Sequence, residues 1–131
     1  MTASLQLARA LIDIPSITPD DAGCQQLLAD RLQPLGFDAE WLNFGEVTNV
    51  ILTHGQFADD EPSLWFLGHT DVVPTGPLED WSSPPFNSEI RDGVLYGRGA
   101  ADMKGSVAAA VVAAEALVRE FPDHKGQIGI L

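Results

Sequence analysis

The chain has 131 residues, 45% of them hydrophobic, and a formal net charge of −12 that comes from 19 acidic and seven basic residues. This size and composition fit one globular domain, and the charge argues against binding to nucleic acid or to an anionic membrane surface. Because the chain has one cysteine, no secretory signal pattern and no apolar run near the roughly 20 residues of a membrane span, we expect a cytoplasmic protein.

The first third of the chain predicts two helices. Apolar residues at helical spacing between positions 5 and 12 form one face of the first helix, which ends before Pro15 because a proline disfavours helical geometry in the residue before it. Thr18 is then expected to cap a second helix that runs to about Leu35. Gly36 follows it and suits the left-handed conformation at which many helices stop.

Extended segments follow these helices. Residues 37–41 alternate between apolar and polar side chains, as in a strand with one exposed face. Residues 47–53 and 64–67 are richer in apolar residues, so we expect them to be more central strands. Residues 89–96 predict a hairpin, because the Asp92-Gly93 pair favours a turn in which both central residues have positive φ.

The last part of the chain predicts a long helix and a further strand. The helix is expected over residues 103–121, and because residues 107–114 are apolar all round, it should be covered on more than one side. A strand is expected from Gln127 to Leu131, where it would leave an unpaired edge beside the helix. This alternation of helices and strands predicts an α/β fold, with a mixed sheet flanked by helices.

Three residues have the chemistry of a metal site. His69 follows the apolar segment 64–67, and imidazole nitrogen and carboxylate oxygen both bind zinc, cobalt or manganese. Asp71, two residues later in an extended segment, faces the same side as His69 and can hold its ring. Asp102 opens the long apolar helix among Gly97, Gly99 and Gly105, and its two oxygens permit a bridge between two ions.

The same residue types also have structural interpretations. A lone histidine is more often a hydrogen-bonded structural or surface residue, and that is how we interpret His54 and His124. An aspartate that opens a helix is more often its cap, and two candidate ligands are fewer than the three or four of a zinc site. Spacing alone therefore leaves both interpretations of His69 and Asp102 open.

Three segments together resemble the M20 family of co-catalytic zinc amidohydrolases. They are His-Thr-Asp-Val-Val-Pro at 69–74, Trp-Ser-Ser-Pro-Pro-Phe at 81–86, and Asp-Gly-Val-Leu-Tyr-Gly-Arg-Gly-Ala-Ala-Asp-Met-Lys-Gly at 92–105. The match in order, spacing and identity covers essentially the whole chain and includes Leu-Ile-Asp-Ile-Pro-Ser-Ile-Thr-Pro at 11–19. The chain therefore resembles the family along its length and not at one motif.

The resemblance implies a role for each candidate residue. His69 would bind one zinc ion, Asp102 would bridge two, and Asp71 would orient and polarise His69. It also implies a cis peptide bond between Asp102 and Met103. A complete subunit would hold two Zn²⁺ ions, for which Co²⁺ or Mn²⁺ could substitute.

The resemblance also implies an activity, which is amide hydrolysis of a small acylated amino acid by a homodimer. Within the family, the segment 98–105 most resembles members that act in bacterial lysine and diaminopimelate biosynthesis. The reaction implied is the conversion of N-succinyl-LL-2,6-diaminoheptanedioate and water to succinate and LL-2,6-diaminoheptanedioate. Deacetylation of acetylornithine, another M20 peptidase activity, and a non-catalytic module are the alternatives. Retention of His69, Asp71 and Asp102 argues against the last, because a packing module has no need for buried carboxylates.

One part of the family pattern is missing. The family has two adjacent glutamates, a general base and a zinc ligand, after the strand that here begins at Gln127, and neither is present. Further ligands and a dimerisation domain would also follow. We therefore expect residues 1–131 to be the incomplete, N-terminal part of a zinc-peptidase-like catalytic domain, with negligible activity alone.

Overall fold

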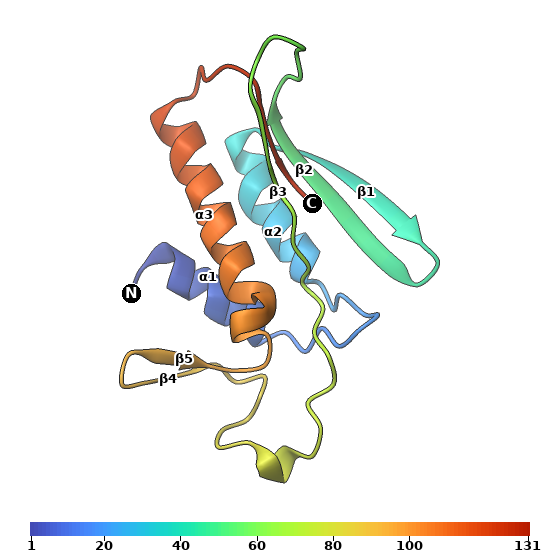
Figure 1. The fold of residues 1–131 in the computed structure, drawn as a ribbon, viewed down its shortest axis with the longest axis vertical. Coiled ribbons are helices and arrows are strands. Elements are labelled where there is room, and N and C mark those ends of the chain that lie inside the picture. Colours follow the sequence, from blue (N-terminus) through green and yellow to red (C-terminus); the bar gives the residue numbers. More distant parts are fainter.

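The computed structural model describes residues 1–131 as helices packed beside a twisted sheet, with a separate small hairpin (Figure 1). Helix α1 packs against α3, and α2 contacts both α3 and β2. None of the helices has the length and apolar character to cross a membrane. The helices are α1 (Ala3–Ile12), α2 (Cys24–Leu32) and α3 (Gly105–Glu120), and the strands are β1 (Asp38–Phe44), β2 (Val47–Gly55), β3 (Ser63–Phe66), β4 (Glu89–Arg91), β5 (Val94–Tyr96) and β6 (Gln127–Ile130).

The main sheet is mixed, which confirms the predicted α/β class. Its order is β1-β2-β6-β3, with β6 antiparallel to β2 and parallel to β3. The prediction of an unpaired edge at residues 127–131 was wrong, because β6 lies between two strands. The prediction that residues 64–67 are central was also wrong, because β3 is an edge strand and its Leu64 is half exposed. An apolar composition shows that a strand is suited to burial and does not show how many neighbours it has.

Helix α2 starts later than predicted. The backbone N–H of Thr18 bonds Val72 O in the loop after β3 at 3.0 Å, so this residue belongs to a contact between loops and caps no helix. Ala22 and Gly23 have φ values of 51° and 92°, which no α-helix permits. Gly36 has a φ of 92°, so its predicted left-handed stop is confirmed.

The predicted hairpin is present as β4 and β5. Asp92 and Gly93 form its turn with φ values of 50° and 80°, as the Asp-Gly pair predicted. The predicted long helix is present as α3, although Met103 lies outside it because its φ and ψ are not helical.

The core lies where α1, α2 and α3 meet β2 and β6. Helix α3 is covered less completely than predicted, because one strip that includes Ala109, Ala113 and Ala116 stays exposed. Its one buried acid, Glu115, accepts a 2.8 Å hydrogen bond at Oε2 from Nη2 of Arg31 on α2, and Nε of Arg31 lies 2.6 Å from Oε1, so the charge is not left unpaired. The residues of α3 that are buried are Val107, Ala108, Val111, Ala114, Glu115 and Val118.

Candidate metal centre

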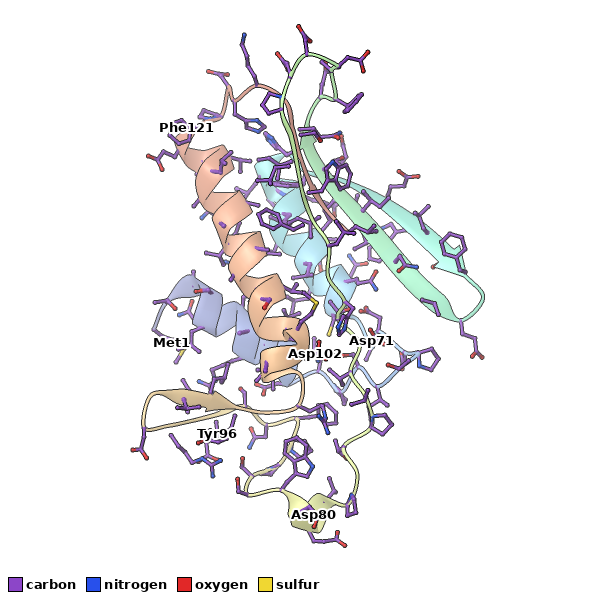
Figure 2. The ribbon with its side chains drawn as sticks, in the orientation of Figure 1. Met1, Asp71, Asp80, Tyr96, Asp102 and Phe121 are labelled. Atoms are coloured by element: carbon purple, nitrogen blue, oxygen red, sulfur yellow. The ribbon has the colours of Figure 1, made fainter.

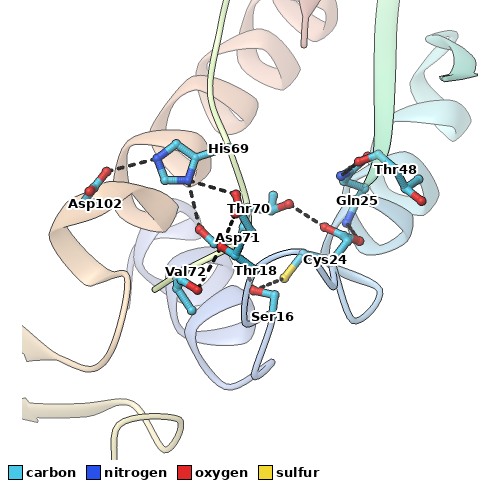
Figure 3. A network of polar contacts seen from close by, with 11 residues as sticks. Ser16, Thr18, Cys24, Gln25, Thr48, His69, Thr70, Asp71, Val72 and Asp102 are labelled. Carbon is cyan, nitrogen blue, oxygen red and sulfur yellow. Dashed lines mark hydrogen bonds and ion pairs between the residues drawn. The ribbon is translucent and has the colours of Figure 1, made fainter. Parts of the chain in front are cut away.

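His69, Asp71 and Asp102 lie together although they come from two separate segments of the chain (Figures 2 and 3). His69 and Asp71 are in the loop after β3, and Asp102 is in the irregular turn Ala100–Lys104 that precedes α3. Nε2 of His69 lies 3.1 Å from Oδ1 of Asp102, across 33 positions of sequence. The three residues singled out in the sequence therefore form one cluster.

The other ring nitrogen of His69 faces Asp71. Nδ1 lies 2.9 Å from the backbone oxygen of Asp71 and 3.4 Å from its carboxylate Oδ1. The close acceptor is therefore the carbonyl, and the carboxylate adds negative charge slightly further away. A ring that donates its Nδ1–H in this way keeps the lone pair on Nε2 for a metal or a proton.

Asp71 is itself held by a residue that we did not predict for this site. The hydroxyl of Thr18 donates to Oδ2 of Asp71, as Figure 3 shows. We had predicted Thr18 as a helix cap, and no local spacing points to a contact 53 positions away. This contact could be found only from the fold.

The turn that carries Asp102 is anchored by a buried lysine, which sequence reasoning also missed. Lys104 is fully buried, and its Nζ donates to the carbonyls of Leu11 and Ile14 at the end of α1, at 2.7 Å each. Burial lowers the pKa of Lys104, because removal from water disfavours the charged form. The end of α1 is a suitable place for a cation, because the helix dipole is negative there.

The backbone around Asp102 is unusually tight. The Asp102–Met103 peptide bond is cis, as the family resemblance implied, and both residues have non-helical φ and ψ. Gly99 has a φ of 83°, and a Cβ there would lie 2.6 Å from Cγ1 of Val72. Only glycine therefore allows the Asp102 turn to approach the loop of His69 so closely.

The cluster is open to solvent, so the expectation of buried carboxylates, which argued against a non-catalytic module, was wrong. The exposed fractions of the side chains are 46% for His69, 39% for Asp71 and 89% for Asp102. A hollow of about 240 Å³ adjoins all three, and a more apolar groove of about 320 Å³ adjoins His69 and Asp71. A metal ion and a small molecule could reach these side chains without a change of fold.

The donor set fits part of a zinc site. Zinc bonds imidazole nitrogen and carboxylate oxygen at about 2.0–2.2 Å, so two ligands of one tetrahedral ion lie about 3.3 Å apart, close to the 3.1 Å found here. No three His, Cys, Asp or Glu side chains are placed so that they could hold one metal ion together. The geometry suits His69 and Asp102 as two ligands of one ion, and a complete zinc site would need further ligands.

The remaining histidines pair with each other, in agreement with their structural interpretation. Nδ1 of His54, near the end of β2, lies 2.7 Å from Nε2 of His124 in the turn before β6. Burial and the neighbouring His124 lower the pKa of His54. These two rings therefore differ from His69 in their partners, and the pKa of His54 shifts in the opposite direction to that of His69.

We expect the pKa of His69 to lie above its ordinary value of 6.5 in the metal-free chain. The main cause is the carbonyl of Asp71, which accepts from Nδ1, and the carboxylate of Asp102 adds to it. The contribution of these His69 contacts to the free energy of unfolding is fully present below pH 6.5, and it is lost as the pH rises through the pKa of His69 in the folded chain. NMR titration of the ring protons should show a larger drop in this pKa for Asp102→Asn than for Asp71→Asn, which keeps the carbonyl.

His54 is the internal control for this titration, because its pKa should fall below 6.5 in the same sample. A His69 pKa at or below that of His54 would contradict the prediction.

A family model for peptidase family M20/M25/M40 matches residues 65–131, which is just over half of the chain. The chain belongs to peptidase family M20/M25/M40. The matched residues include all three members of the cluster and the whole of α3. The resemblance inferred from residues 69–105 is thereby confirmed.

Curated relatives within the M20 family extend the match to the full chain. A protein named succinyl-diaminopimelate desuccinylase from Thioalkalivibrio sulfidiphilus is 58% identical over all 131 residues, and one of the same name from Stenotrophomonas maltophilia is 61% identical over the same length. The chain covers 34% of each relative. It therefore spans about a third of the length of the curated relatives it matches.

Solved structures of M20 proteins share the fold. An M20 family metallo-carboxypeptidase from Sulfolobus solfataricus matches 99% of the chain with a TM-score of 0.80 at 21% identity, over 30% of its own length. A dinuclear metal-binding M20 peptidase from Bacillus subtilis matches 97% with a TM-score of 0.63 at 19% identity, over 33% of its length. These matches confirm the architecture of the chain.

Proposed function

We propose that residues 1–131 are the N-terminal part of the catalytic domain of a succinyl-diaminopimelate desuccinylase. The longer protein, called the full-length protein below, would hydrolyse N-succinyl-LL-2,6-diaminoheptanedioate to succinate and LL-2,6-diaminoheptanedioate in lysine and diaminopimelate biosynthesis. The observation that carries this proposal is the identity of 58% and 61% to two proteins of that name along the whole chain.

In this proposal His69 and Asp102 would hold the metal centre of two Zn²⁺ ions, and Asp102 would be the ligand shared between them. Bound zinc would acidify a water molecule and stabilise the oxyanion that forms on the amide carbonyl. The support is the convergence of Nε2 and Oδ1 to 3.1 Å at a solvent-open cluster. Co²⁺ or Mn²⁺ could take the same ligands.

Asp71 would act on the reaction through His69. With a metal bound, its carbonyl would hold the proton on Nδ1, which leaves the lone pair of Nε2 for the metal on the side of Asp102. Its carboxylate, at 3.4 Å, stabilises positive charge that develops on the ring. The base that takes the proton from water is not among these three residues.

The remaining parts of the proposal concern the full-length protein. We propose a cytoplasmic homodimer that acts on a small acylated amino acid and binds neither nucleic acid nor membranes. The net charge of −12 supports the exclusion of nucleic acid, because it would repel a phosphate backbone.

The test is hydrolysis of N-succinyl-LL-2,6-diaminoheptanedioate beside N-acetylornithine by the full-length protein, with zinc and after chelation. We expect zinc-dependent turnover of the succinyl substrate and little of the acetyl substrate. Preference for N-acetylornithine would replace the proposal with a deacetylase, and absence of turnover of both would favour a non-catalytic module. The 131-residue chain alone should show negligible turnover.

A further inference from the structure

Four side chains form a continuous series of contacts that begins at a residue outside the candidate ligands. The hydroxyl of Thr18 donates to Oδ2 of Asp71, Oδ1 of Asp71 lies 3.4 Å from Nδ1 of His69, and Nε2 of His69 lies 3.1 Å from Asp102. Figure 3 shows these contacts as one connected series from Thr18, in the segment between α1 and α2, to Asp102, in the turn before α3. Thr18 thus fixes the end of the carboxylate that faces away from the histidine.

The loop that carries Asp71 is attached to the α1–α2 segment without the Thr18 hydroxyl. Val72 N donates to Ser16 O at 2.8 Å, and Thr18 N donates to Val72 O at 3.0 Å. The buried hydroxyl of Ser16 donates to Thr70 O at 2.7 Å. The backbone and Ser16 therefore hold this loop in place, and the Thr18 side chain is left for the carboxylate.

The Thr18 hydroxyl has one proton and two acceptors within reach. Its oxygen lies 3.3 Å from Val72 O, and its contact with Oδ2 of Asp71 is shorter. Hydrogen bonds to a carboxylate are stronger than bonds between neutral groups, so the proton goes to Asp71. Because Thr18 is exposed, its removal would leave no cavity in the core.

We propose that Thr18 is a positioning residue for the metal centre, acting through Asp71 on His69. A carboxylate turns about its last side-chain bond, which has a broad range of angles. The Thr18 hydroxyl restricts that rotation, so Oδ1 stays towards Nδ1 of His69 and the ring stays oriented with Nε2 towards Asp102. This inference rests on the proposed zinc amidohydrolase function.

The test compares Thr18→Val and Thr18→Ser in the full-length protein. Valine keeps the shape and removes the donor, so we expect zinc affinity and kcat each to fall about tenfold, in the range found for groups that orient a metal-binding histidine. The KM should change less than twofold. The Tm should stay close to that of the unmodified protein. Serine restores the hydroxyl and should return both zinc affinity and kcat to near their original values.

Thr75→Val is the matched control, because the Thr75 hydroxyl lies in the same loop and bonds only Gly76 O, at 3.0 Å. It should leave zinc affinity and kcat unchanged. Zinc affinity, measured by competition with a chromophoric chelator, tests Thr18 even if the unmodified protein does not hydrolyse the succinyl substrate, a result that would defeat the proposed function alone. Zinc affinity within twofold of the original in Thr18→Val, or an equal loss in Thr18→Ser, would overturn the inference.

Discussion

An Asp102→Ala variant of the full-length protein is expected to hydrolyse N-succinyl-LL-2,6-diaminoheptanedioate about 1000-fold more slowly, the upper range for removal of one electrostatic group from an active site. Asp102 is the more open of the two clustered carboxylates, because only its Oδ1 contacts another side chain, at Nε2 of His69, whereas Asp71 is engaged by both Thr18 and His69. Its side chain is 89% exposed, so truncation removes almost no packing. The loss should therefore appear in kcat and in bound zinc and not in the Tm.

The measurements are steady-state kinetics, the zinc content after gel filtration, and the Tm. Asp123→Ala is the matched control, because it removes an exposed aspartate from the turn after α3 and should leave all three values unchanged. An Asp102→Ala protein that keeps more than a tenth of the original kcat would refute a role for Asp102 as the bridging ligand.

Replacement of Lys104 by methionine is expected to lower the free energy of unfolding of the chain by about 3 kcal/mol. The change removes both hydrogen bonds from the charged Nζ, and a hydrogen bond to a charged group is worth about 1.5–3 kcal/mol. Leu11 O still accepts from Ile14 N at 3.2 Å and Ile14 O still accepts from Ser16 N at 2.9 Å, so neither carbonyl loses its only donor. Methionine fills much of the vacated space, so the effect comes from the lost hydrogen bonds and not from a cavity.

Urea unfolding followed by circular dichroism checks this value. The matched control is Lys125→Met, since Lys125 is exposed in the turn before β6 and its loss should change the free energy by less than about 0.5 kcal/mol. Equal effects of the two substitutions would show that the contacts of Lys104 with α1 do not stabilise the fold.

Local signals in the sequence predicted those elements whose cause is local. The Asp92-Gly93 turn needs two positive φ values, which its own residues supply. Helix α3 follows from a long apolar run, and Gly36 supplies its own left-handed stop. The start of α2 could not be predicted in this way, because Thr18 pairs with Val72 in a loop that is distant in sequence.

The candidate site shows the same division. His69, Asp71 and Asp102 were recognisable by residue type and by family resemblance, but their approach to within 3.1–3.4 Å depends on the packing of two loops. Lys104 and Thr18 were missed because their partners are carbonyls and a carboxylate from remote segments. Nothing in the pattern around a lysine shows that it will be buried.

The edge position of β3 has a consequence for the chain in solution. Edge strands that face water are commonly protected by lysine, proline, a bulge or very short length, and Ser63–Phe66 has only its four-residue length. Its outer backbone groups have no strand partner, and Leu64 and Trp65 are 51% and 38% exposed beside them. The 131-residue chain on its own therefore exposes an edge strand that can pair with a second copy of the chain. Its tendency to self-associate should increase with protein concentration.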